Sequence, residues 1–531
     1  MSQSCLVNLM EEGTRDLVDR SEHIGLNFIA AYLRSNAIDI SVIDANFYWY
    51  SDQQVIEMLI AEKPKIIGFS LYERMLKRVV MISQAVRAAL GDVHITLGGH
   101  NASFDAEAIL SRFPTIDSVV VGEGEATFLE LTSVLLKGQS WQSISGLAYY
   151  NGSECVFTPS RILIKNLDDL PFPNRAGPLN GIHTEYLNIS ASRGCYAQCS
   201  FCTTPVFYGF KGTGRRLRAR SPKHLLDEIE YLLGLYGPHV KFWFSDDNFT
   251  HIKYWDRTWY DTFIAEIRQR RLQFSFAVNS RTDSVTEELF SELKEVGLCS
   301  VFLGIESGVQ ETLDFYRKRV TVDRQKQAVQ ILHDLGISMR IGWIMYNPYS
   351  TLEQLYQNIA FLEEIGYFTL LKQYRYPLSL KGSLSAYPGT PVLRTLQKNG
   401  DIPLHRTEYL DWKYEFRESR IPLLQSLLQE WVKAIEPVIE RDSLYLMETA
   451  KAQSLHEIHD EIVRVSDTFM LLDLRFYRTM LDLVSSEPDP EAVWKAYRII
   501  YPDFASSLRQ IDEHLIDFQA ALLDTVPAVR P

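Results

Sequence analysis

The sequence has little of what marks several common classes of protein. It has six cysteines in 531 residues, too few for the disulfide framework of a small secreted domain. We find no signal peptide, no apolar run long enough to span a bilayer and no low-complexity tract. Its 54 Lys and Arg residues face 67 Asp and Glu residues, and the net charge of −13 argues against nucleic acid as a partner. These absences predict a cytoplasmic protein with no membrane span.

The composition that remains is that of an ordinary globular chain. Hydrophobic residues make up 46% and charged residues 23% of the sequence. A chain of this length is expected to form about three domains. There is therefore enough chain for several sizeable cores.

The first 150 residues alternate between short apolar segments and amphipathic segments. The apolar segments predict strands at Cys5–Leu9, Ile38–Ile43, Lys65–Ser70, Val93–Leu97 and Ser118–Val121. The amphipathic segments predict helices at Ile24–Leu33, Gln53–Ala61 and Leu76–Leu90. Because short apolar strands with helices between them form parallel sheets, we predict an α/β domain with a doubly wound parallel sheet over residues 1–150.

Ligands of such sheets bind beyond the carboxyl ends of the strands. Three predicted strands end in small or polar residues, and glycine there permits close approach of a bulky ligand. The candidate cofactor-binding residues at these ends are Ser70, Leu71, Tyr72, Gly98, Gly99, His100, Gly122, Glu123 and Gly124.

The rest of the chain divides into three further segments. Residues 151–185 predict a linker, because prolines follow one another in Leu170–Asn174. Residues 186–400 predict six βα units and hence a partial TIM-like barrel, with chemistry at the carboxyl ends of its strands. Residues 401–531 predict a helical domain, with helices at 423–435 and 458–483, that closes over the barrel mouth and helps choose the substrate.

The barrel segment alternates as regularly as the first. After the strand at 186–190, strands are predicted at 240–244, 273–278, 300–304, 339–345 and 370–374. Helices are predicted at 222–235, 254–270, 287–296, 324–335 and 352–365. Ser221 and Pro222 suit the start of the first of these helices, as cap and first-turn residue.

Three cysteines stand close together after the strand at 186–190. Cys195, Cys199 and Cys202 form a C-x3-C-x2-C run. Four cysteines complete the coordination of an Fe–S cluster, so three leave one iron of a four-iron cluster open to a small molecule. Zinc is the alternative, but it calls for a fourth ligand nearby, and the other cysteines are scattered.

This run resembles the motif of the radical S-adenosylmethionine (SAM) enzymes, including the aromatic residue Phe201 before the last cysteine. The resemblance implies a [4Fe–4S] cluster on the three cysteines, which are both its metal ligands and the catalytic residues. It also implies that SAM binds the open iron. Phe201 is itself a candidate cofactor contact. Polar residues near the later strand ends are candidate SAM contacts, and the Asp246/Asp247 and Glu306 segments among them match the family pattern. The polar candidates are Asp246, Asp247, Ser280, Glu306 and Arg340, and the other interpretation of each is a helix cap or a barrel ion pair.

The first domain resembles the cobalamin-binding domain found in front of many radical SAM enzymes. The matching segments are Leu97–His100 and Val121–Thr127. Many cobalamin proteins carry a D-x-H-x-x-G motif whose His ligates cobalt, but here Asp19, His23 and Gly25 have the wrong spacing. His23 is therefore not assigned as a cobalt ligand. The alternative is a flavodoxin-like domain that binds another ligand or none.

Together these resemblances imply a cobalamin-dependent radical SAM enzyme, most readily a methyltransferase acting on an unactivated carbon. The implied cofactors are the [4Fe–4S] cluster, SAM and methylcobalamin, with flavodoxin or ferredoxin as electron donor. The substrate would be a small molecule, a peptide or a lipid. Three alternatives stay open: ring formation without net methylation, a radical SAM enzyme without cobalamin, and a non-enzymatic Fe–S or corrinoid carrier.

Two further groups of residues have both a purely structural and a functional interpretation. Lys211, Arg215, Arg216, Arg218 and Arg220 are either a solvated loop or a site that attracts an anion. Tyr409, Trp412 and Tyr414 are either a wall of the substrate site or ordinary core, and core packing is the expected role.

Overall fold

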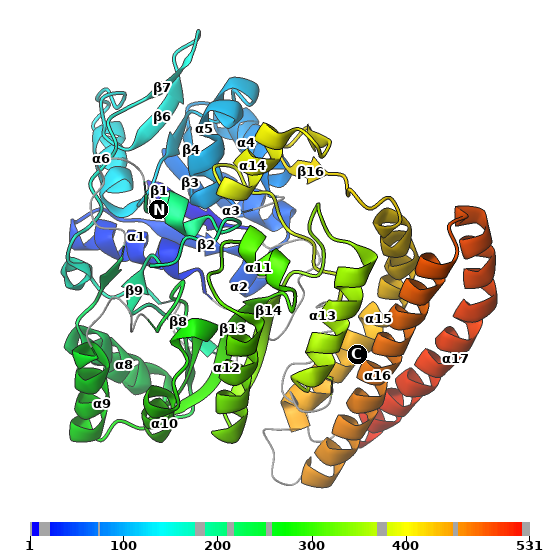
Figure 1. Cartoon of the computed structure of the whole chain (residues 1–531). Coiled ribbons are helices and arrows are strands. Elements are labelled where there is room, and N and C mark those ends of the chain that lie inside the picture. The colour runs from blue at the N-terminus through cyan, green and yellow to red at the C-terminus, as the bar shows by residue number, and fades with distance from the viewer. Residues whose placement is uncertain are drawn as a thin grey trace. The chain divides into compact units, whose positions relative to one another are not determined.

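The computed structural model describes residues 3–9, 22–72, 75–175, 186–209, 217–250, 257–368, 380–449 and 455–522. The chain forms two compact units. The first unit comprises Met1–Cys299, Tyr316–Lys318 and Ser385–Lys413. The second unit comprises Ser300–Phe315, Arg319–Leu384 and Tyr414–Pro531. Figure 1 labels the elements of both along the chain.

A seven-stranded sheet opens the first unit. Its strands, in the spatial order β2-β1-β3-β4-β5-β6-β7, are Ser41–Asp44, Ser4–Asn8, Ile66–Ser70, His94–Gly98, Ser118–Val120, Leu147–Tyr150 and Cys155–Phe157. The first five pair in parallel, and the last two pair antiparallel. The chain order reverses between β1 and β3, which is the point where doubly wound sheets bind ligands.

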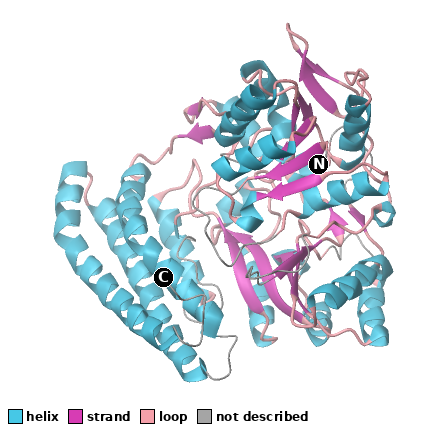
Figure 2. Ribbon diagram, turned by 180° about the vertical axis from the view of Figure 1, so that it is seen from behind, coloured by secondary structure: helices cyan, strands magenta, loops and turns pink. Residues whose placement is uncertain are grey.

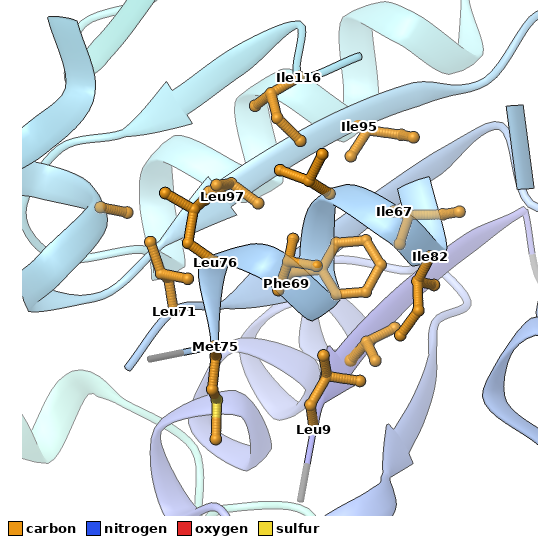
Figure 3. Close-up of a cluster of buried hydrophobic side chains, with 14 of the residues drawn as sticks. Leu9, Ile67, Phe69, Leu71, Met75, Leu76, Ile82, Ile95, Leu97 and Ile116 are labelled. Atoms are coloured by element: carbon orange, nitrogen blue, oxygen red, sulfur yellow. The ribbon is translucent and has the colours of Figure 1, made fainter. Parts of the chain in front are cut away.

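Helices cover both faces of this sheet. Leu6 and Ile66 share one hydrophobic cluster with α1 (Ile24–Ser35) and α6 (Glu125–Leu136). The alternate residues of β1, β3 and β4 share another with α3 (Asp52–Glu62), α4 (Leu76–Leu90) and α5 (His100–Arg112). Figure 3 shows part of the second cluster, including Ile67, Phe69 and Leu97. The predicted doubly wound α/β architecture is therefore confirmed, although the sequence patterns missed α5 and α6.

The β6–β7 hairpin extends this sheet beyond residue 150, into the segment where the sequence predicts a linker. Its turn depends on Asn151, whose side-chain oxygen accepts hydrogen bonds from Ser153 N and Glu154 N, both at 3.0 Å. Gly152 follows with a φ of 97°, a conformation that glycine adopts without strain. An Asn-Gly pair between two apolar runs is a hairpin signal that the proline-based interpretation overlooked. The boundaries of the four segments stay predictions.

A second run of βα units begins in the first unit. Strands β8 (Tyr186–Ile189), β11 (Lys241–Phe244) and β12 (Ser275–Arg281) pair in parallel. The helices that follow them are α8 (Pro222–Tyr236), α9 (Thr258–Arg270) and α10 (Glu287–Glu295). Ser221 caps α8 as predicted, because its Oγ accepts a hydrogen bond from His224 N at 3.2 Å. Two short strands, β9 (Ser192–Arg193) and β10 (Arg218–Ala219), pair antiparallel on either side of the cysteine segment.

The second unit continues the alternation and ends in long helices. Strand β13 (Leu298–Glu306), which begins in the first unit, pairs in parallel with β14 (Ser338–Trp343). Helices α12 (Val322–Asp334) and α13 (Leu352–Glu364) follow these strands, after the short α11 (Gln310–Phe315). The strand predicted at 370–374 lies outside the described residues. Both predicted C-terminal helices form, within α15 (Ile421–Thr449) and α16 (His456–Ser486), and α17 (Pro490–Leu522) is an addition (Figure 2).

Aromatic packing holds the long helices together. Trp431 is fully buried and stacks on Phe476 with ring centroids 4.4 Å apart. Its indole N–H donates to the buried Asp473 carboxylate at 2.6 Å. No helix in the described parts of the chain combines the length and the apolar character needed to cross a membrane.

Tyr409, Trp412 and Tyr414, for which core packing is the expected role, each make contacts of their own. Tyr409 stacks on Phe113 at 6.1 Å and packs against the first core. Trp412 lies under the Arg406 guanidinium, 5.3 Å from its ring centroid. Tyr414 donates its hydroxyl to Leu384 O at 2.9 Å in the second unit. These contacts favour structural roles for all three.

Candidate functional site

The three cysteines of the C-x3-C-x2-C run lie on the loop between β9 and α7 (Thr204–Phe207). Cys199 is buried, Cys195 and Cys202 are half-buried, and all three are free thiols. Among the described residues, no three His, Cys, Asp or Glu side chains are arranged to hold one metal ion. A polynuclear cluster places each thiolate on a different iron and so needs wider spacing than a single ion does.

Hydrogen-bond donors point at the sulfur atoms. Ala197 N donates to Cys195 Sγ at 3.4 Å, and Arg281 Nη1 donates to Cys199 Sγ at 3.1 Å. Burial raises the pKa of Cys195 to about 12 and the pKa of Cys202 to about 11. Burial by itself therefore favours the protonated thiols. Cationic iron, together with the N–H donors, would stabilise the thiolate forms, so the residues present fit a cluster.

Phe201 packs the loop rather than facing the cavity described below. Its ring lies 5.1 Å from that of Tyr316, in an edge-on arrangement. The neighbouring Ser200 N donates to Tyr316 O at 2.8 Å. These contacts fix the backbone between the second and third cysteines, and contact of Phe201 with a cofactor stays a prediction.

The two aspartates after β11 have different environments. Asp246 is buried and accepts hydrogen bonds from Ala191 N at 3.0 Å and from the Ser192 hydroxyl. Burial raises its pKa to about 7. Asp247 accepts from Gly194 N at 3.2 Å and from Thr204 Oγ1 at 2.7 Å, and it lines the cavity. Of the two predicted SAM contacts, Asp247 is the one placed to meet a ligand there.

Ser280, Glu306 and Arg340 lie on three successive strands. Ser280 is buried inside β12, not beyond its end as predicted, and its hydroxyl lies 2.6 Å from that of Thr250. Glu306 is the last residue of β13 and has a φ of 73°, which is uncommon for a residue other than glycine. Arg340 lies on β14, as predicted, and its Cα pairs with Phe302. Contacts of these three residues with SAM stay predictions.

A cavity of about 310 Å³ opens at the carboxyl ends of β3, β4 and β5. Of the nine residues predicted at these ends, eight line it: Ser70, Tyr72, Gly98, Gly99, His100, Gly122, Glu123 and Gly124. Another part of the lining comes from residues on either side of the three cysteines and from the end of β11. It includes Ser190, Ser192, Arg193, Phe207 and Tyr208, with Asp247 after β11. One cavity in the first unit therefore borders both the first sheet and the cysteine segment.

The glycines of this cavity are needed for their backbone and their small size. Gly99 has a φ of 96° and Gly122 a φ of 89°, where other residues are strained. A Cβ on Gly122 would meet no atom within 4 Å and would take up space beside the cavity. A broad ligand can thus lie against the sheet edge, which fits a corrin ring.

Leu71 is a correction to the predicted site. Its side chain is 4% exposed and belongs to the hydrophobic core of the first unit. It follows Ser70, and successive side chains of an extended segment point in opposite directions. Leu71 therefore supports the cavity floor from behind rather than lining it.

The imidazole of His23 is held by hydrogen bonds on both nitrogens. Nδ1 accepts from Leu26 N at 3.1 Å, so in the neutral ring the proton sits on Nε2. Nε2 lies 2.9 Å from both Ser70 Oγ and Tyr72 Oη. A protonated ring nitrogen cannot ligate a metal, which agrees with leaving His23 out of the cobalt ligands.

Glu123 is held by cations at the cavity wall. Arg193 Nη1 donates to it at 3.0 Å, and Arg218 donates through two nitrogens at 3.0 and 2.9 Å. Burial would raise the pKa of Glu123, but the two guanidiniums outweigh burial and hold it below its usual range. Because Arg193 lies two residues before Cys195, this ion pair ties the first sheet to the cysteine segment.

The basic run also ties structure together where the structure describes it. Arg218 donates to Ile164 O at 2.7 Å besides Glu123. Arg220 pairs with the buried Glu228 at 2.5 Å and donates to Ser190 O at 3.0 Å. Lys211, Arg215 and Arg216 lie outside the described residues. For Arg218 and Arg220, the contacts support a structural role over an anion site.

His100 joins the cavity to the cluster loop. Its Nδ1 lies 3.3 Å from Thr203 Oγ1, next to Cys202, and its ring centroid lies 4.0 Å from that of Phe207. Burial lowers the pKa of His100, although the nearby Asp247 opposes the shift. The neutral imidazole is thus part of the wall between the strand end and the cysteines.

Sequence patterns did not single out two arginines that contact residues of the site. Arg193 adjoins the cysteine motif, and Arg281 ends a strand one residue after the predicted Ser280. A charged residue within or beside a buried apolar strand was a signal for both, because such a residue needs a partner.

Two protein families match separate parts of the chain. The B12 binding domain matches residues 17–132, and the radical SAM superfamily matches residues 189–362. The chain is 27% identical over 346 residues to an uncharacterized methyltransferase, PH0819, of Pyrococcus horikoshii; the match covers 64% of this chain and 73% of the relative. It is 29% identical over 346 residues to an anaerobic magnesium-protoporphyrin IX monomethyl ester cyclase of Rubrivivax gelatinosus, covering 62% of this chain and 59% of the relative, less than two thirds of its length.

The fold is similar to that of a solved protein. The structure of the cobalamin-dependent SAM radical enzyme OxsB, with aqua-cobalamin and SAM bound, matches with a TM-score of 0.71 and 18% identity. The match covers 98% of this chain and 81% of that one. At this level of identity, the likeness concerns the fold.

These findings define the chain as a radical SAM enzyme. More narrowly, it belongs to the cobalamin-dependent radical SAM enzymes, which join a B12 binding domain to the radical SAM domain. The cofactors of this combination of domains are a [4Fe–4S] cluster, SAM and cobalamin.

Proposed function

We propose that this chain is a C-methyltransferase that moves a methyl group from methylcobalamin to an unactivated carbon of a small molecule. One observation carries the proposal. The cavity described above is bordered both by glycine-rich strand ends and by the cysteine segment with Asp247. A methyl donor and a radical generator must face a common substrate, and this cavity borders the residues proposed for both.

The bound cofactors would supply a hydrogen-abstracting radical, from SAM and the cluster, and a transferable methyl group, from cobalamin. Cys195, Cys199 and Cys202 would hold the cluster, and Asp247 would accept hydrogen bonds from the SAM ammonium group. Gly99 and Gly122 would admit the corrin ring to the sheet edge.

Two residues of the second unit, on its strands β13 and β14, are also proposed as SAM contacts. Glu306 would contact the ribose or amine of SAM, and Arg340 would pair with its carboxylate. The strained backbone of Glu306 supports a functional role, because a cost of about 1–3 kcal/mol is normally retained only where the geometry is needed. Its neighbours are fixed, since Ser307 Oγ and Gly308 N both bond to Asn358 Oδ1 at 3.0 and 2.9 Å.

Two partners belong to the proposal. A low-potential flavodoxin or ferredoxin would reduce the cluster, because each substrate radical requires one electron from outside the chain. The long helices α15, α16 and α17 would contribute to the choice of substrate.

Ring formation without net methylation is the second candidate. It is favoured by the similarity to a relative named as a cyclase, whereas the similarity to a relative named as a methyltransferase favours the first. Both reactions use the same cavity, so only the product distinguishes them.

The test is anaerobic reconstitution with iron, sulfide and hydroxocobalamin, followed by desalting, iron analysis and an ultraviolet–visible spectrum. The proposal expects a cluster band together with retained corrin bands. The loaded enzyme is then given SAM labelled in its methyl group, a strong reductant and candidate acceptors. Label in a carbon-bound methyl of the product supports methylation. A cyclised, unlabelled product supports the second candidate, and loss of corrin bands on desalting would contradict both.

A further inference from the structure

Arg281 connects the end of β12 to the cluster loop. Its Nη1 donates to Cys199 Sγ at 3.1 Å, and its Nη2 donates to Lys318 O at 2.7 Å. Its Nε donates to Asp283 Oδ1 at 3.0 Å and lies 3.3 Å from Tyr196 Oη. The side chain is only 9% exposed. A permanent cation therefore lies in hydrogen-bond contact with Cys199 Sγ, a proposed cluster ligand, away from bulk water.

This guanidinium is held in one orientation. Its Cζ lies 5.6 Å from the centroid of the Tyr196 ring, and Tyr196 follows Cys195 in the loop. The Tyr196 hydroxyl in turn donates to Asp283 Oδ1 at 3.1 Å and lies 3.0 Å from Ser284 Oγ. Arg281 N also donates to Asn248 Oδ1 at 3.0 Å. With its donors committed to fixed partners, the Nη1–H cannot turn away from the sulfur.

We propose that Arg281 raises the reduction potential of the cluster and that Asp283 limits this effect. Arg281 is thus a positioning residue for electron entry, acting through Cys199. The inference rests on the proposed function only in requiring the cluster, not in requiring methyl transfer.

The direction follows from the charges. Reduction adds one electron and no proton to the cluster, so the reduced form is the more negative one. A nearby cation and an N–H bond to sulfur stabilise that form more than the oxidised form. Burial strengthens both effects, because the local dielectric is lower than in water. The Asp283 carboxylate, 3.0 Å from Arg281 Nε, offsets part of the cation's charge.

The main variant is Arg281→Gln, which removes the cation but keeps a hydrogen-bond donor. Wild type and variant are reconstituted with iron and sulfide alone, without cobalamin or substrate. Iron content is measured, and the midpoint potential is obtained from an anaerobic redox titration followed by electron paramagnetic resonance (EPR). At a fixed potential, we expect the ratio of reduced to oxidised cluster to fall about tenfold, which is about 59 mV for a one-electron couple.

Three further variants separate tuning from folding. Arg281→Lys keeps the positive charge but not the planar set of guanidinium donors. Its midpoint potential should therefore lie between those of Arg281→Gln and wild type. Asp283→Asn keeps the Arg281–sulfur contact and removes the opposing charge, so its potential should rise. Arg268→Gln breaks an exposed pair with Glu295 and should leave the potential unchanged, since its side chain is 54% exposed.

The outcomes are distinguishable. An Arg281→Gln potential equal to wild type, with full iron content, would overturn the inference. If that variant cannot hold iron, Asp283→Asn decides, and an unchanged or lowered potential there would also overturn it. A wild-type protein that takes up no cluster would instead contradict the proposed function before any variant is compared.

Discussion

Two parts of the proposed site are built in different ways. The cluster loop is the loop between β9 and α7 that carries Cys195, Cys199 and Cys202, and the proposed corrin side is the part of the cavity at the carboxyl ends of β3, β4 and β5. The loop acts through side chains: three thiols, with backbone and guanidinium donors aimed at sulfur. The corrin side acts mainly through backbone, with Gly99 and Gly122 in conformations that other residues avoid. A site made of reactive side chains depends on residue identity, whereas a site made of backbone depends on space.

This difference predicts opposite responses to substitution. In the cluster loop, a substitution that removes one cysteine sulfur removes a proposed cluster ligand without unfolding the chain. On the corrin side, addition of a side chain at a glycine takes space from the ligand. The predictions that follow test this contrast, beginning with the largest effect.

Cys199→Ala should abolish SAM cleavage and leave cobalamin bound. The substitution removes a cluster ligand but touches none of the residues that line the corrin side. The readouts are 5′-deoxyadenosine by mass spectrometry and corrin absorbance after desalting. Cys155→Ala, in the β6–β7 hairpin, is the matched control and should behave like wild type. Retained cleavage in the Cys199 variant would overturn the cluster assignment.

Gly122→Leu should weaken cobalamin retention by about tenfold or more, which corresponds to about 1.4 kcal/mol. The added side chain occupies open space beside the cavity, while the cluster loop keeps its ligands. The readouts are corrin content and iron content of the same sample. Gly138→Leu is the control, because Gly138 has a φ of 66° and open space around its Cβ but does not line the cavity. Equal corrin loss in both variants would mean that strain, not lost space, is the cause.

Glu123→Gln should destabilise the first unit by about 3 kcal/mol, because it removes the carboxylate that pairs with buried Arg218, whereas half-buried Arg193 keeps its pair with Glu125. The pKa of Glu123 is lowered in the folded chain from 4.5. Its contribution to stability is therefore present above that pH and is lost as pH falls through the lower, folded pKa. Urea unfolding of the apoprotein at pH 7 and in mild acid measures both effects.

The control for this variant is Glu130→Gln on α6, the helix that follows Glu123. Glu130 pairs with Arg161 at the surface and is 49% exposed, so its loss should cost less than about 1 kcal/mol. If the two variants unfold at the same urea concentration, the ion pairs of Glu123 contribute no more to stability than the exposed pair of Glu130 does.

Asp246→Asn should change the pH dependence of stability rather than the cofactor content. The folded chain raises the pKa of Asp246 to about 7 from 3.8, so the folded state keeps its proton longer than the unfolded state does. Stability from this group is complete below the unfolded pKa and is lost as pH rises toward and past the folded pKa. The wild type should lose about 1.4 kcal/mol between pH 6 and pH 8 relative to the variant. Parallel stability curves would contradict this assignment.

The sequence predicts the cluster better than it predicts the corrin side, for a physical reason. The spacing of the three cysteines in the sequence identifies a cluster motif directly, and Cys195, Cys199 and Cys202 do share one loop. The strand ends were also predictable, since the alternation of strands and helices fixes where a doubly wound sheet binds. Individual side chains there were not: Leu71 points into the core, and Glu123 is held by Arg193 and Arg218.

Other features depend on contacts distant in sequence. The Arg281–Cys199 bond joins residues 82 positions apart, which no local pattern reveals. The choice between Asp246 and Asp247 depends on which carboxylate Ala191 and Ser192 occupy. The β6–β7 hairpin, by contrast, was readable from Asn151 and Gly152.

The central claim is that cobalamin and the cluster border one cavity. It is tested most directly by EPR of protein loaded with both, comparing cob(II)alamin beside the oxidised cluster with cob(II)alamin beside the reduced one. The account predicts that the cob(II)alamin signal broadens or splits when the cluster is reduced, because two unpaired spins then lie across the same cavity. An unchanged signal, with both cofactors retained in full, would contradict it.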